Sequence, residues 1–96
     1  MNLQTLKDSL KNDLPPAGLS VPLQALWHQA NGNWTAAHDL LQNQNDQAGC
    51  WVHALLHREE GDIPNANYWY RRAGRSMFEG SLEAEWAAIA EALLAE

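Results

Sequence analysis

Several features are scarce in this sequence, and each absence narrows what the protein can be. Cys50 is the only cysteine among 96 residues, so no intrachain disulfide can form, as is usual in a reducing compartment. No apolar run reaches the about 20 residues that a membrane span needs, and residues 1–13 lack the apolar core of a signal peptide. We therefore expect a soluble, cytoplasmic protein.

Positive charge is also scarce. Six Lys and Arg residues face twelve Asp and Glu residues, which gives a formal net charge of −6. Nucleic acid and anionic lipid attract clusters of cations, so this balance argues against both as partners. Four arginines lie between positions 58 and 75, however, so a local basic patch is compatible with the negative overall charge. A glycine-rich phosphate loop and a serine nucleophile motif are both missing, so we predict no catalytic residue, no cofactor and no enzymatic activity.

What the sequence does have is apolar residues at spacings of three and four, the pattern of amphipathic helices. Leu3, Leu6, Leu10 and Leu14 form one such stripe, which Pro15 ends. No segment alternates with period two, so no strand is expected. The pattern predicts an all-α single domain over residues 1–96 with about six helices: an N-terminal helix at 1–14, helix pairs at 20–44 and 48–77, and an acidic C-terminal helix at 81–95.

The two helix pairs share a pattern. Aligning Gly32 with Gly61 shifts the chain by 29 residues. A small residue and a histidine then match before the glycine, and a helix cap and a second small residue match after it. Repeats of this kind bury their apolar faces by stacking. The superimposed pairs are Ala25 with Ala54, Leu26 with Leu55, His28 with His57, Asn33 with Asp62, and Ala37 with Ala66.

At these positions the chain resembles a known superfamily. Gly61-Asp62, Ala66, Tyr70 and Ala73 resemble the second half of a tetratricopeptide repeat, and the stretch 66–73 is closer to the Sel1-like variant. The resemblance covers about 20–77, although the period is shorter than in either family and the first copy lacks the Trp-Tyr pair. It implies antiparallel helix-turn-helix repeats that bind peptides or assemble proteins.

The same resemblance implies a ligand groove along the inner helices. Its positions here are an aromatic, two aliphatics, an amide and a cation, of the kinds that interface hot spots favour. We predict a module that binds a protein or peptide partner, or itself as a homodimer. The competing interpretation is that the terminal helices of this chain cover the groove. The groove positions are Trp51, Leu55 and Arg58 in the second copy, with Leu26 and Gln29 in the first.

An arginine group follows the second copy. Arg71 and Arg75 are four apart, as helix neighbours are, and Arg72 lies alongside. Guanidinium groups bind carboxylate or phosphate in bidentate fashion. The favoured interpretation is a solvated charge match with the Glu-rich final helix, which contributes little to stability. The alternative is a site for an anion or an acidic peptide.

His53 and His57 are four residues apart, with Glu60 three further on, so one helical face carries all three. This spacing can hold a transition metal, but Ala54 stands where a zinc-protease signature needs Glu. Because His57 repeats His28, a polar contact between helices is the favoured interpretation, and no metal is assigned. The alternative function is a small metal-binding protein or enzyme that uses His53, His57 and nearby polar residues.

Overall fold

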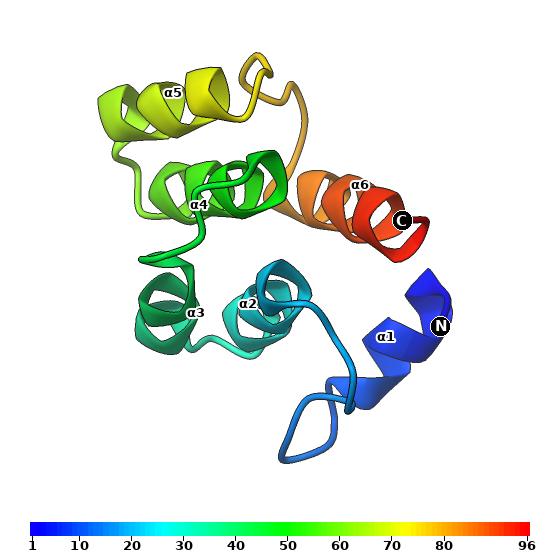
Figure 1. Ribbon diagram of the computed structural model, residues 1–96. Coiled ribbons are helices and arrows are strands. Elements are labelled where there is room, and N and C mark those ends of the chain that lie inside the picture. The colour runs from blue at the N-terminus through cyan, green and yellow to red at the C-terminus, as the bar shows by residue number, and fades with distance from the viewer.

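A computed structural model describes the whole chain, residues 1–96. It contains six α-helices and no strands (Figure 1), so the predicted all-α class with about six helices is confirmed. None of these helices has both the length and the apolar character that crossing a membrane requires. The helices are α1 (Leu3–Ser9), α2 (Val21–Ala30), α3 (Trp34–Leu41), α4 (Gln47–Glu59), α5 (Ile63–Arg72) and α6 (Leu82–Leu94).

Helix α4 lies at the centre of the packing. It contacts α5 on one side and both α2 and α3 on another, and α2 also packs against α3 (Figure 1). Helix α6 contacts α2 and α4, while α1 contacts α6, so the two ends of the chain lie on the same side of the molecule. Residues 49–57 of α4 are all buried, as expected of a helix that is surrounded by others.

Short polar side chains start the helices. The hydroxyl of Ser20 accepts the N–H of Leu23 at the start of α2, and the carboxylate of Asp62 accepts the N–H of Asn65 at the start of α5. Such caps pair backbone donors that a first helical turn leaves without partners. A proline in the first turn of α2 and of α5 needs no such partner. The remaining helices begin in the same way, at Asn2, Asn33, Asp46 and Ser81.

Helices α2 and α4 end in the same kind of turn. Gly32 and Gly61 have φ angles of 78° and 83°, which residues with a β-carbon rarely adopt. The N–H of the residue after each glycine donates to the carbonyl of His28 or His57, at 2.9 Å in both cases. The turn sends α3 back along α2 and α5 back along α4. The residues that follow α4 therefore lie beside the last turn of α4.

Two helices are shorter than the sequence predicted. Helix α1 ends at Ser9 rather than at 14, and Leu14 is 75% exposed. The hydroxyl of Ser9 accepts the indole N–H of Trp27 at 3.1 Å, which fixes the end of α1 against α2. Helix α5 ends at Arg72 instead of running to position 77, because Gly74 has a φ of 73° and closes the helix with a turn like those after α2 and α4.

Candidate functional site

The predicted groove is covered. Leu26 and Leu55 have no exposed surface and Trp51 is 7% exposed, so these three side chains belong to the core and form no open groove. Helix α6 lies over them, and the indole N–H of Trp86 donates to the carbonyl of Leu26 at 2.9 Å. The structure therefore agrees with the second interpretation of the groove, in which a terminal helix covers it.

The two polar groove positions are engaged within the chain as well. The side-chain amide of Gln29 donates to the carboxylate of Glu59 at 3.1 Å. Arg58 donates to the carboxylate of Glu85, at 2.8 Å, and to the carbonyl of Gly80. Arg58 therefore connects α4 to α6 and to the segment before it.

Glu85 also accepts the hydroxyl of Tyr70 at 2.5 Å, and its side chain has no exposed surface. We call Arg58, Glu85 and Tyr70 the ion-pair network. Burial, and then the hydrogen bond to Glu85, raise the pKa of Tyr70 well above its ordinary value of 10.0. Both oxygens of the Glu85 carboxylate have donors, so the network is fully paired.

The arginine group does not behave as predicted. Since α5 ends at Arg72, Arg71 and Arg75 are not neighbours on a helix. None of the three arginines forms an ion pair with α6. The guanidinium of Arg72 lies 4.9 Å from the ring centroid of Trp69, and that of Arg75 lies 3.3 Å from the ring centroid of Trp51. These are cation–π contacts with two different indoles, and Arg71 is exposed to solvent.

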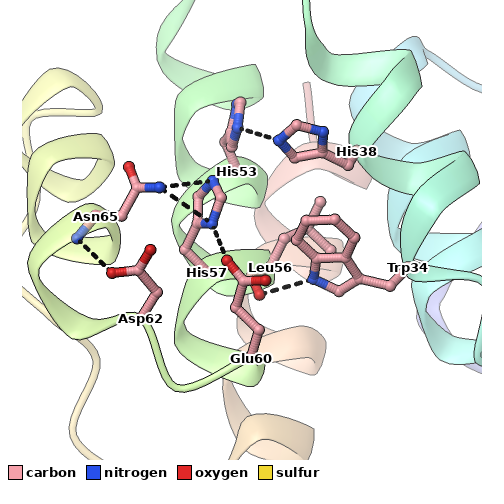
Figure 2. Close-up of polar contacts among 8 residues, drawn as sticks. All are labelled: Trp34, His38, His53, Leu56, His57, Glu60, Asp62 and Asn65. Atoms are coloured by element: carbon pink, nitrogen blue, oxygen red, sulfur yellow. Dashed lines mark hydrogen bonds and ion pairs between the residues drawn. The ribbon is translucent and has the colours of Figure 1, made fainter.

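Three histidines come together on the other side of α4. We call His38 of α3 with His53 and His57 of α4 the histidine cluster (Figure 2). The Nε2 atoms of His38 and His53 are 3.2 Å apart. The ring centroids of His53 and His57 are 4.9 Å apart, and one ring nitrogen from each of the three imidazoles lies within 4.8 Å of the others.

Helix geometry and two tryptophans position these rings. His53 and His57 share one face of α4 because they are four residues apart. Trp34 and His38 are likewise four apart on α3, and their rings stack with centroids 4.8 Å apart. The Trp34 indole donates to the carbonyl of Leu56 at 2.9 Å, which fixes the His38-bearing face of α3 against α4.

On the other side, α5 supplies a second aromatic wall. The ring of Trp69 stacks on His53 at a centroid distance of 3.8 Å and an interplanar angle of 8°. His53 is thereby held between α3 and α5, and its side chain has little freedom to rotate. Trp34 and Trp69 are each only partly buried, as is His38, so the cluster reaches the surface along its His38 side.

The turn after α4 supplies polar partners for His57. The Glu60 carboxylate lies 2.6 Å from Nδ1 of His57 (Figure 2), and the side-chain amide nitrogen of Asn65 lies 3.4 Å from both ring nitrogens. A carboxylate at Nδ1 favours the tautomer with its proton there, which leaves the lone pair on Nε2. This is the arrangement that commonly orients a metal-binding histidine.

His53 is the most deeply placed member, with 4% of its surface exposed. Burial, followed by the nearby His57, His38 and Arg72, lowers the pKa of His53 to about 4. Its imidazole is therefore neutral at pH 7, as a metal ligand must be. Its Nδ1 has no hydrogen-bond partner in the protein, so the hydrogen bonding of the cluster is incomplete.

The sequence pattern pointed to His53 and His57 but not to His38. The available signal was the four-residue spacing of Trp34 and His38, which places His38 on the face of α3 that turns inward. Only the packing of α3 against α4 shows that this face meets the histidines of α4.

No protein-family model matches the chain, and no curated protein or solved structure matches it either. Its resemblance to tetratricopeptide and Sel1-like repeats therefore stays a prediction from residues 20–77.

Proposed function

We propose that this protein binds a divalent transition-metal ion through Nε2 atoms of His38, His53 and His57. The observation that carries the proposal is the 3.2 Å separation of two Nε2 atoms. Two nitrogen ligands at about 2.0–2.1 Å from a tetrahedral zinc ion lie roughly 3.3–3.4 Å apart. A metal could therefore sit between these imidazoles with little movement, and a ring nitrogen of His57 lies within 4.8 Å of theirs.

The surroundings of the cluster support the same function. Glu60 holds Nδ1 of His57 and favours the tautomer whose lone pair is on Nε2, while burial keeps His53 neutral. Imidazole ligands suit zinc, nickel, copper and iron. Because Trp34 and Trp69 stack on two of the rings, the donors are already in place before an ion arrives, and little conformational entropy is lost on binding.

Isothermal titration of the chelator-treated protein with zinc and with nickel tests this function. We expect one ion per chain, and we expect His53→Ala and His57→Ala each to abolish tight binding. His28→Ala is the matched control, because His28 lies on α2 against Trp27, outside the cluster. The proposal fails if the wild type takes up no ion, or if the cluster variants bind as tightly as His28→Ala.

A second candidate is the interaction role implied by the tetratricopeptide-like pattern, in a cytoplasmic setting. It is supported by Tyr68 on α5, which is 46% exposed and lies beside the guanidinium of Arg72. Tyrosine and arginine are residue types enriched in binding hot spots. An affinity pull-down should then recover a partner with the wild type but not with a Tyr68→Ala/Arg72→Ala variant, and equal recovery by both would count against this role.

A further inference from the structure

The histidine cluster offers three imidazole ligands. No other histidine, cysteine, aspartate or glutamate places a ligand atom together with the three imidazoles. Glu60 is engaged with Nδ1 of His57, on the side of that ring away from Nε2. The thiol of Cys50 is directed to the carbonyl of Asn45 at 3.8 Å. Structural zinc sites are closed by four protein ligands, whereas sites with three keep a position for water or substrate.

The charge of such a site is unbalanced. Three neutral imidazoles do not offset the two positive charges of the ion. The nearby carboxylates are Glu60, which contacts His57, and Asp62, which has an oxygen within 4.8 Å of a ring nitrogen of His57; both are exposed. His53 and His57 are buried, at 4% and 6% exposure, so charges there interact more strongly than in bulk water. A bound ion is the largest charge in its surroundings and favours an anionic ligand at an open position.

The cluster is nearest to solvent at His38. His38 is partly exposed, and Trp34 beside it is partly exposed as well, while His53 and His57 lie deeper. Figure 2 shows the His38 imidazole extending from α3 toward α4, so it lies at the edge of the cluster rather than beneath it. A small ligand would approach along this edge, past the rings of Trp34 and His38.

Building on the proposed metal binding, we infer that the ion keeps one exchangeable coordination position and that this position takes a small oxyanion, a carboxylate or a phosphate. The metal site then accepts an external ligand. It is not a structural centre in which protein ligands fill every coordination position.

Cobalt-loaded protein provides the test, because the visible absorption of Co²⁺ reports its coordination. Sodium acetate and sodium phosphate are titrated separately at constant ionic strength, with sodium perchlorate as the weakly coordinating salt. We expect saturable band shifts with at least one of the two anions and none with perchlorate, with one cobalt per chain after desalting. The anion that acts distinguishes a carboxylate from a phosphate ligand.

The failures are distinguishable. Cobalt that binds but whose spectrum neither anion changes overturns the exchangeable position and leaves metal binding intact. No cobalt uptake overturns the proposed function itself. Glu60→Gln adds a test of the charge argument: at saturating cobalt, removal of the carboxylate that contacts His57 should tighten the active anion by about threefold or more. Unchanged or weaker anion binding in Glu60→Gln contradicts the charge argument.

Discussion

Two polar groups sit on the last turns of α4, and they are built in opposite ways. In the ion-pair network, Glu85 accepts from both Arg58 and Tyr70, so a fully buried carboxylate has a donor at each oxygen. In the histidine cluster, His38 and His53 share one contact between two nitrogens, and Nδ1 of His53 has no partner at all.

Under the proposed metal binding, this difference separates a structural ion pair from a binding site. Buried polar atoms are nearly always paired, and an incomplete group needs an explanation. The ion-pair network needs none, because it joins α4, α5 and α6 and completes its own hydrogen bonds. The histidine cluster gathers ring nitrogens from three imidazoles and leaves Nδ1 of His53 without a partner. Three imidazole nitrogens close together are what a site for a transition-metal ion requires. The comparison predicts that the network controls stability and that the cluster controls metal affinity.

The largest expected effect is on stability. Glu85→Ala leaves Arg58 and Tyr70 without their acceptor, and breaking a buried ion pair from one side costs about 3–5 kcal/mol. Urea denaturation of the metal-free protein measures this loss. Zinc affinity of the variant that remains folded should stay within about twofold of the wild type. A large fall in zinc affinity with unchanged stability would contradict the assignment of stability to the network and metal affinity to the cluster.

The next effect comes from the metal. An ion that binds only the folded state adds about 2.7 kcal/mol to the free energy of unfolding at a hundred times its Kd. Zinc should therefore raise the urea midpoint of the wild type and leave that of His53→Ala unchanged. Equal stabilisation of both proteins would show that zinc binds elsewhere.

A smaller effect is expected from the partner of His57. Loss of a carboxylate that orients a metal-binding histidine typically weakens metal affinity by about 10- to 100-fold. Glu60→Gln should show this loss in a zinc titration. Glu59→Gln is the control, because Glu59 pairs with Gln29 and touches none of the three imidazoles. Similar losses in the two variants would mean that general surface charge, and not the contact with His57, sets the affinity.

The smallest effect concerns alkaline pH. The folded pKa of Tyr70 lies above 10.0, its ordinary value, which the unfolded chain retains. The unfolded state therefore loses this proton first, so the stabilisation is complete below pH 10 and declines as the pH rises above it. Urea midpoints between pH 8 and 11 should fall less for Tyr70→Phe than for the wild type. Tyr68→Phe, at an exposed tyrosine, should follow the wild type.

The sequence predicted the helices well because their signals are local. Spacings of three and four, together with caps such as Ser20 and Asp62, depend only on residues within one turn. The predicted ends of α1 and α5 lie beyond the residues at which these helices end. Leucines at 10 and 14 continue the stripe, but the contact of Ser9 with Trp27 fixes the end of α1 earlier. Gly74, with its positive φ, ends α5 before position 77.

The site depends on contacts between helices, so the sequence predicted it only in part. His53 and His57 lie on one helix, and their common face followed from spacing. His38 joins them only because α3 packs against α4. The groove was left with two interpretations for a related reason, since nothing in the repeat pattern shows that α6 covers Leu26 and Leu55.

The glycine turns after α2 and α4 have a consequence for how such a site could arise. Their backbones are alike, yet the residue just before the glycine is Asn31 in one and Glu60 in the other, and only the second turn adjoins the histidine cluster. Exchange of the residue before Gly61 would therefore remove the carboxylate that contacts His57 while the backbone of the turn stayed the same.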